Sequence, residues 1–208
     1  MIGWEVLVCD VPYRTNVYYR MDEKSRCAVV IDAAPSSFAA LSKRLKGYHI
    51  QVFLTHAHWD HIADAKRFQS ELKATIFLHA ADVPLIWNQK LQSWIADGKP
   101  YEPFVPDKVW KKKTTLSFGG LTFRILPLPG HTPGSVGIYD EKHRQLFSGD
   151  TLFYRNIGRT DLGGSMERLK DSLQVLSRLP PETVVYPGHG MPTTIEQEKD
   201  IFARFQKR

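Results

Sequence analysis

The stretch that decides the fold of this chain is residues 51–61, QVFLTHAHWDH. Its first four residues form a short apolar run, which predicts a buried strand. The strand leads directly to three imidazoles and one carboxylate, which are groups that bind Zn²⁺ and similar divalent ions. His56 and His58 are two residues apart, so on extended backbone they point the same way and can bind one ion. Asp60 and His61 follow as the chain turns, and they can face a second position close by.

Length and composition favour one globular domain. The chain has 208 residues, of which 42% are hydrophobic, and no run approaches the roughly 20 apolar residues that cross a bilayer. The first ten residues lack the basic start of a secretory signal, so we expect a cytoplasmic location and no membrane partner. Cys9 and Cys27 lie far apart and outside any C-x-x-C pair, and we expect both to be reduced thiols.

The charge of the chain indicates the kind of partner. The formal net charge is +6, a mild bias toward anionic molecules. The densest basic run, residues 111–113, is interpreted as the solvated start of a strand, and nucleic acid is not an expected partner. The predicted partner is a small, anionic substrate molecule, and the sequence sets no oligomeric state.

Four predicted strands each end in a turn that contains a candidate ligand. In chain order, these turns contain residues 56–61, His131, Asp150 and His189. Loops at strand ends, held by a rigid sheet, are a usual place for chemistry. The repetition therefore indicates one site built from four separate segments of the chain.

The remaining pattern alternates strands with a few helices. Strands are predicted at residues 4–9, 16–20, 27–31, 51–54, 74–79, 114–118, 121–128, 135–139, 145–147 and 183–186, and helices at 36–46, 62–72 and 166–178. Asp32 follows a predicted strand, where it either braces the histidine loop or caps a turn. Residues 82–110 are less regular; their aromatic residues either pack in the core or form a lid or pocket wall over the metals.

The ordered motifs resemble a known family. H-x-H-x-D-H is followed by a Pro-Gly-His-Thr-Pro-Gly turn at residues 129–134, then by Gly-Asp at 149–150 and Gly-His at 188–189. This set is similar to that of the metallo-β-lactamase superfamily, over nearly the whole chain. The resemblance implies a four-layer αββα sandwich, with two mixed sheets face to face and helices outside. It implies a single domain over residues 1–208, with metals at one edge of the sheets.

The resemblance also implies the ligands of two divalent metal ions. His56, His58 and His131 would hold one ion, Asp60, His61 and His189 the other, and Asp150 would bridge both. Asp60 and Asp150 are the candidate catalytic residues. Two ions about 3.5–4 Å apart can share a water molecule and lower its pKa, so that a bridging hydroxide forms near neutral pH. Zinc is the expected metal, and iron and manganese accept the same ligands.

Further stretches resemble one branch of the superfamily. Residues 149–153, 157–161 and 185–190 are similar to glyoxalase II and its single-domain bacterial relatives, which implies hydrolysis of glutathione thioesters such as S-lactoylglutathione. Arg159 is then the candidate that binds a substrate carboxylate, with Arg155 a weaker one. The alternative for Arg159 is a salt bridge to the nearby Asp161. The sequence shows no C-terminal helical domain that would complete a glutathione site, so another small thioester, an ester or a lactone stays open.

Two rival activities fit the same motifs. Persulfide dioxygenases resemble this set but use one iron, whose ligands here would be His56, His131 and Asp150. A lactonase is the second rival, in which Tyr154 could assist ring opening. A nucleic-acid phosphodiesterase would need a substrate-gripping arm or extra domain, and the sequence shows neither.

Overall fold

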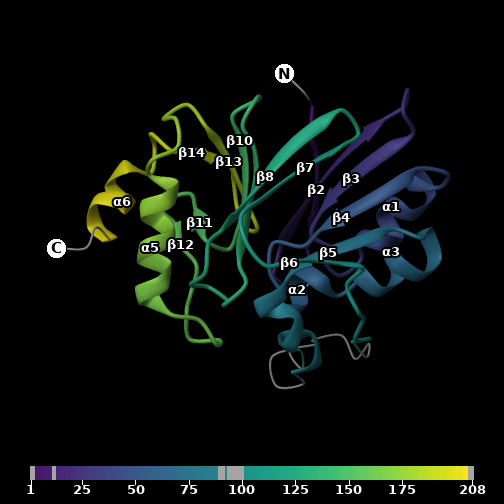
Figure 1. Cartoon of the computed structure of the whole chain (residues 1–208), viewed down its shortest axis with the longest axis horizontal. Helices are drawn as coiled ribbons and strands as arrows, with labels where there is room; N and C mark the ends of the chain where they lie inside the picture. Colours follow the sequence, from purple (N-terminus) through teal and green to yellow (C-terminus); the bar gives the residue numbers. More distant parts are fainter. Residues whose placement is uncertain (1–2, 11–12, 89–91, 93–100, 206–208) are drawn as a thin grey trace.

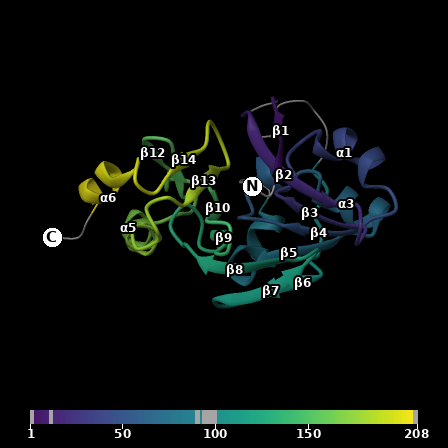
Figure 2. The same ribbon diagram turned by 90° about the horizontal axis from the view of Figure 1, so that it is seen from above.

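Two six-stranded sheets lie against each other, with helices on their outer faces (Figure 1). The computed structural model describes residues 3–10, 13–88, 92 and 101–205. Helices α1 and α3 cover one sheet, and α5 and α6 cover the other, as the view from above also shows (Figure 2). The predicted αββα sandwich is confirmed.

The first sheet is built from the N-terminal half of the chain. Its order is β1 (Glu5–Cys9), β2 (Thr15–Asp22), β3 (Cys27–Ile31), β4 (His49–Phe53), β5 (Thr75–His79) and β6 (Lys108–Trp110). Strands β1 to β3 are antiparallel, and β3 to β6 are parallel. Parallel neighbours need crossover connections, which here contain α1 (Ser37–Leu45), α2 (Trp59–Ile62), α3 (Ala65–Leu72) and the 3₁₀ helix η1 (Ala80–Trp87). The carboxyl ends of β3 and β4 therefore meet at one edge of the sheet.

The second sheet is built from the C-terminal half. Its order is β14 (Thr193–Thr194), β13 (Val184–Pro187), β10 (Gln145–Gly149), β9 (Val136–Asp140), β8 (Leu121–Pro127) and β7 (Thr114–Phe118). Only the β10–β13 pair is parallel among the described strand pairs of this sheet. A small hairpin of β11 (Leu152–Phe153) and β12 (Asn156–Ile157) follows β10, and α5 (Met166–Leu176) and α6 (Lys199–Phe205) lie outside.

Side-chain alternation along the strands separates the layers. In β3, Ala28 and Val30 belong to the core beneath α1 and α3, whereas Val29 and Ile31 belong to the core between the sheets. This period of two is what a strand buried on both faces requires. A third core lies between the second sheet and the helices α5 and α6. The sandwich thus holds its two sheets rigidly, which fixes the loops at their shared edge.

One predicted helix, at residues 62–72, is divided into α2 and α3. The break arises because the backbone of Ala33 enters between them: its N–H donates to the carbonyl of His61 at 2.7 Å, and its carbonyl accepts from the N–H of Asp64 at 2.9 Å. The short strands β6, β11, β12 and β14 were not predicted, since two or three residues show no periodicity. Of the less regular stretch 82–110, residues 89–91 and 93–100 lie outside the described residues.

The structure also bears on the state of the cysteines and on membrane-spanning helices. Cys9 and Cys27 are both free thiols, as predicted. Among the described residues, the helices are too short or too polar to cross a membrane.

Candidate metal centre

The candidate ligands meet at the shared edge of the two sheets. His56 and His58 lie on the loop after β4, Asp60 and His61 lie on α2, and the segments that contribute from the second sheet are the β8–β9 loop, the end of β10 and the β13–β14 loop. These last three segments contain His131, Asp150 and His189. The structure therefore brings all seven predicted ligand residues together.

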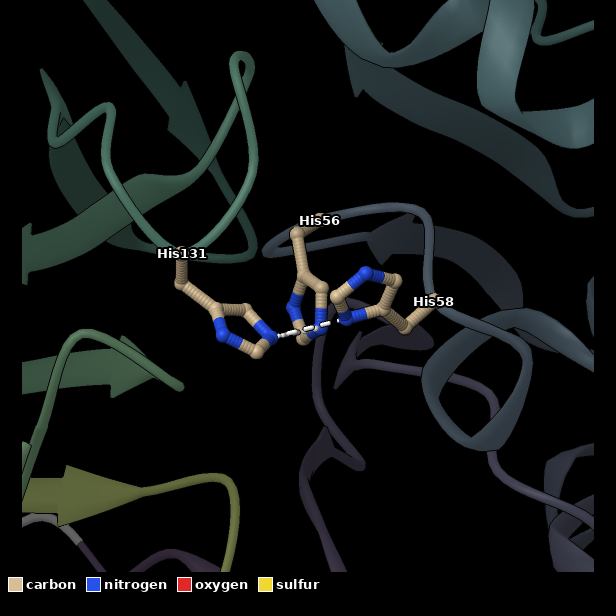
Figure 3. Close-up of side chains that lie close together, drawn as sticks. All are labelled: His56, His58 and His131. Carbon is tan, nitrogen blue, oxygen red and sulfur yellow. Dashed lines mark hydrogen bonds between the residues drawn. The ribbon is translucent and has the colours of Figure 1, made fainter. Parts of the chain in front are cut away.

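Three imidazoles form the first cluster (Figure 3). Nδ1 of His58 lies 2.8 Å from Nε2 of His131, and that nitrogen lies 3.2 Å from Nε2 of His56. All three side chains are buried. Their rings point toward one another from loops of different sheets (Figure 3). Three nitrogens thus surround one small volume.

Asp60, His61 and His189 form the second cluster. Nε2 of His189 lies 3.2 Å from Oδ2 of Asp60 and 3.3 Å from Nε2 of His61. Asp150 lies between the two clusters. Its Oδ1 is 3.3 Å from Nε2 of His61, and its Oδ2 is 3.3 Å from Nε2 of His189 and 3.6 Å from Nε2 of His131. This is the position that a bridging carboxylate would occupy.

Glycines allow the chain to pack closely around Asp150. A Cβ atom on Gly188 would lie 2.2 Å from Oδ1 of Asp150, and one on Gly158 would lie 1.8 Å from the backbone oxygen of Asp150. Both distances are far below the roughly 3.5–4.0 Å of ordinary contact. The Gly-His pattern at residues 188–189 therefore has a steric reason, because only glycine fits beside the carboxylate.

In each histidine, one ring nitrogen faces the cluster and the other, the outer nitrogen, faces a hydrogen-bond partner outside it. That partner decides which of the two nitrogens is protonated. For three of them the partner is a backbone carbonyl, which can only accept, so the outer nitrogen must donate. These pairs are His58 Nε2 with Leu162 O at 3.4 Å, His131 Nδ1 with Arg159 O at 2.7 Å, and His189 Nδ1 with Tyr13 O at 3.0 Å. The nitrogen that faces the cluster is then an unprotonated acceptor in the neutral ring.

Asp32 fixes the other two histidines. Its Oδ2 accepts from Nδ1 of His61 at 2.7 Å and from the hydroxyl of Thr55 at 2.9 Å. Because the Thr55 hydroxyl donates to Asp32, it accepts from Nδ1 of His56 at 3.1 Å. Asp32 is buried and also accepts the backbone N–H of Thr55 at 2.7 Å. Of the two interpretations of Asp32, the structure supports the brace.

The donor set therefore fits a cation. When the five imidazoles are neutral, their lone pairs converge with the carboxylates of Asp60 and Asp150, and all of these groups are acceptors. Oδ1 of Asp150 is buried and has no hydrogen-bond partner of normal geometry among the described residues. Acceptors held together without donors repel one another, whereas a divalent ion would bind all of them. The ligand atoms of each cluster lie within 4.8 Å of one another, and so do those of a third group, His56, His61 and Asp150, which links the two clusters.

The protonation states of the two clusters also favour binding of a cation. Burial and the neighbouring imidazoles lower the pKa of His56 well below its usual value and that of His58 to about 4, so both rings are neutral at pH 7. Burial would also lower the pKa of His189, but hydrogen bonds to Asp150 and Asp60 raise it to about 10. Burial would raise the pKa of Asp150, yet neighbouring imidazolium groups hold it well below its usual range. Without a metal, protons on imidazoles balance these carboxylates, and a divalent cation would replace them.

Asp82 is a structural member of the site that sequence reasoning missed. Its buried carboxylate accepts the N–H of Ala57 at 2.9 Å, the hydroxyl of Thr132 at 2.7 Å and the N–H of Gly134 at 2.6 Å. It thereby ties the His56–His58 loop to the loop that contains His131. The signal available in the sequence was a single carboxylate in the otherwise apolar run 80–87, AADVPLIW.

A pocket of about 820 Å³ opens over the clusters. Its outer wall contains the predicted Tyr154 and Arg159, and sequence reasoning missed Tyr13, Phe153 and Met191 in the same wall. These three were missed because their segments lie far apart in the chain and share no motif.

Arg155 and the 82–110 stretch were both interpreted as possible parts of the substrate pocket. Arg155 does not line the pocket; it lies in a turn with φ of 56°, and its N–H donates to Glu198 at 2.9 Å. The described residues of 82–110, the possible lid, do not line this wall, and residues 89–91 and 93–100 lie outside the described part of the chain. Tyr101 and Glu102 instead border a separate hollow on the other side of Trp59.

Arg159 also makes the salt bridge that was the alternative interpretation. Its Nε and Nη2 donate to the two carboxylate oxygens of Asp161 at 2.6 and 2.5 Å. Both side chains are exposed. The bidentate pair stands at the rim of the pocket, so wall residue and salt bridge are both correct descriptions of Arg159.

Comparison with known proteins identifies the family. The candidate metal site lies at the edge of an αββα sandwich, and the model of the metallo-beta-lactamase superfamily matches residues 13–189. Hydroxyacylglutathione hydrolase GloC of Haemophilus influenzae is 32% identical over 185 residues, which cover 86% of each chain. The chain therefore belongs to the metallo-beta-lactamase superfamily, and the class of enzyme that this membership supports is a metal-dependent hydrolase.

Solved structures agree with this assignment. A B3 metallo-beta-lactamase, BLEG-1, has 34% identity and a TM-score of 0.84 over 95% of this chain and 97% of its own. TTHA1623, solved in a di-iron-bound form, has 35% identity and a TM-score of 0.78 over 95% and 96%. ETHE1 from Myxococcus xanthus has 28% identity and a TM-score of 0.78 over 98% and 84%.

Proposed function

We propose that this protein is a binuclear metal-dependent hydrolase that cleaves small thioesters, as glyoxalase II does. The observation that carries the proposal is the convergence of seven acceptor side chains in two clusters with Asp150 between them. The relative from Haemophilus influenzae, a hydroxyacylglutathione hydrolase, supports the substrate class. S-Lactoylglutathione is accordingly the first substrate to test.

In this proposal each of the two clusters supplies the ligands of one metal ion. His56, His58 and His131 would hold one ion, and Asp60, His61 and His189 would hold the other. Asp150, which lies between the two clusters, would be a ligand shared by both ions. Zinc is the proposed metal, with iron or manganese as alternatives. When bound, such a pair of ions supplies Lewis-acid activation of a water molecule and of the substrate carbonyl.

The residues around the ions prepare the reaction in other ways. The hydrogen bonds of Asp32 and of the backbone carbonyls hold each imidazole in one orientation and one tautomer. The apolar wall that contains Phe153 and Met191 keeps the non-reacting part of the substrate out of water and directs its carbonyl to the base of the pocket.

The absence of a spare acid favours a thioester. Among the described residues that line the pocket, the carboxyl groups are those of Asp60 and Asp150, and both belong to the clusters. A thiol, with a pKa of about 8.5, leaves as a thiolate without a proton donor. An alcohol, with a pKa near the roughly 15.7 of water, needs one. A lactonase would therefore depend on the hydroxyl of Tyr154, which lies on the pocket wall.

One rival activity has an observation in its favour. The similarity to ETHE1 keeps a mono-iron dioxygenase that acts on persulfides as the second candidate. His56, His131 and Asp150 would be the iron ligands, and their positions permit it. One iron per chain, with oxygen consumed on glutathione persulfide, would replace the proposed hydrolase with this candidate.

Metal analysis joined to a substrate panel tests the proposal. The panel is S-lactoylglutathione, a homoserine lactone, glutathione persulfide and a β-lactam. We expect two metal ions per chain and turnover of the thioester. His58→Ala and Asp150→Ala should abolish turnover in a folded protein, whereas the matched control His143→Ala, at a histidine bonded to Asp140 and outside both clusters, should keep it. Retained turnover in either ligand variant contradicts that ligand assignment.

A further inference from the structure

Away from the histidine clusters, the outer wall of the pocket contains very little free positive charge. Among the described residues that line it, Arg159 is the one arginine, and no lysine is present. Two other arginines on nearby loops do not line it. Arg14 pairs with Asp10 at 3.4 Å, and the guanidinium of Arg155 lies 5.0 Å from the ring centroid of Tyr154. Binding of an anionic substrate at the wall would therefore depend on Arg159.

Arg159 is already paired. Asp161 accepts from its Nε and Nη2, the two donors that would otherwise grip a carboxylate bidentately. The same hydrogen bonds lower the pKa of Asp161 to about 2, so the carboxylate stays ionised at any physiological pH. The pair is consequently neutral, and a substrate carboxylate would have to displace Asp161 to reach the guanidinium fork.

Apart from Asn156 and Gly190, most of the remaining outer wall is apolar or aromatic. The apolar and aromatic members are Tyr13, Phe153, Tyr154, Ile157, Leu162 and Met191. Several are substantially exposed, Met191 at 60% and Tyr13 at 47%. Exposed apolar side chains that line one pocket offer area that an apolar ligand would bury.

We propose that Asp161 sets the charge preference of the pocket. By neutralising Arg159, it makes the apolar wall the main source of affinity, so the pocket favours thioesters whose thiol part is apolar and weakly charged over those with free carboxylates. The inference rests on the proposed thioester hydrolysis for its reaction. It assigns to Asp161 a specificity role and to the substrate an apolar thiol part.

The test compares two thioesters with the same acyl group. Lactoylglutathione has free carboxylates, whereas lactoyl-N-acetylcysteamine is neutral, and the readout is the ratio of kcat/KM for the first over the second. Asp161→Asn should raise this ratio by roughly tenfold at low ionic strength, because a negative charge near the substrate is removed. About 1 M salt should abolish most of the change.

A double-mutant cycle separates neutralisation from direct binding. Arg159→Gln should lower the kcat/KM ratio, since it leaves Asp161 unpaired. In the double variant, which combines Arg159→Gln and Asp161→Asn, the ratio should lie within about twofold of the wild-type value. Glu141→Gln is the matched control, because it removes the same charge from an exposed pair with Arg124 at the far end of β9, and its ratio should not change. An unchanged or lower ratio in Asp161→Asn overturns the inference. A double variant far below the wild type does so too, because Arg159 would then bind the substrate carboxylate itself.

A binding measurement keeps the inference independent of turnover. Calorimetry gives Kd for S-hexylglutathione and for its glycine monoethyl ester, two thioethers that contain no thioester bond. Asp161→Asn should tighten the free acid by several-fold more than the ester. If the wild type hydrolyses neither thioester, the proposed function fails, and this pair of Kd values still decides the role of Asp161.

Discussion

Replacing Asp82 by Asn tests whether the two metal-binding loops are held together by one carboxylate. The wild-type side chain is fully buried and accepts three hydrogen bonds, with Ala57 and Thr132 on Oδ2 and Gly134 on Oδ1. An asparagine side chain has one acceptor oxygen, and its amino group would face donors at the other position. In either orientation at least one buried donor loses its acceptor.

The size of the effect follows from that count. A buried donor without an acceptor costs about 1–3 kcal/mol, and the better orientation of the introduced amide leaves one such donor, the N–H of Gly134. We therefore expect Asp82→Asn to lower the free energy of unfolding by about 1–3 kcal/mol. Metal affinity should fall by roughly 10- to 100-fold, as is typical when groups that orient metal ligands are changed.

Urea unfolding of the metal-free protein and a competitive metal titration measure the two effects. Asp140→Asn is the control: Asp140 is equally buried and accepts from the N–H of His143, but it lies at the opposite end of β9 from the clusters. It should destabilise the fold and leave metal affinity unchanged. An unfolding free energy for Asp82→Asn within about 0.5 kcal/mol of the wild type, with unchanged metal affinity, would refute the reasoning.

Four further predictions concern the centre and its pocket. Gly188→Ala should displace the carboxylate of Asp150 and weaken metal binding, since the new Cβ would lie 2.2 Å from Oδ1; wild-type metal content would contradict this. Metal binding near pH 8 should release about two protons, because carboxylates, against the effect of burial, raise the pKa of His61 well above its usual value and that of His189 to about 10. Calorimetry in buffers of different ionisation enthalpy measures the release, and none would refute the assignment. In the metal-free protein the same raised pKa values stabilise the fold most below about pH 6.5, and that stability is lost as the pH rises toward 10. Urea unfolding at pH 6.5 and at pH 9 measures this loss. An equal free energy of unfolding at both pH values would be contrary evidence. Arg159→Ala should raise KM for an anionic substrate more than it lowers kcat, and an unchanged KM would remove Arg159 from the site.

The sequence by itself determined the fold and the identity of the converging side chains. Strand-period alternation at residues 27–31 and the apolar run before Thr55 predicted buried strands, and the resemblance of the ordered motifs to a known superfamily implied the sandwich and the set of ligands. The histidines and Asp150 were visible because each follows a strand in a turn of small residues. Such local signals survive in sequence because they are set by neighbours along the chain.

The tertiary structure alone decided how these groups are supported. Asp82 ties together loops from opposite sheets, and the carbonyl of Tyr13 fixes His189 across 176 positions of sequence. The division of the predicted 62–72 helix and the exclusion of Arg155 from the pocket also depend on distant partners, the backbone of Ala33 and the carboxylate of Glu198. Contacts of this kind leave no periodic or local mark, because they arise only when packing of the two sheets brings remote segments within hydrogen-bonding distance.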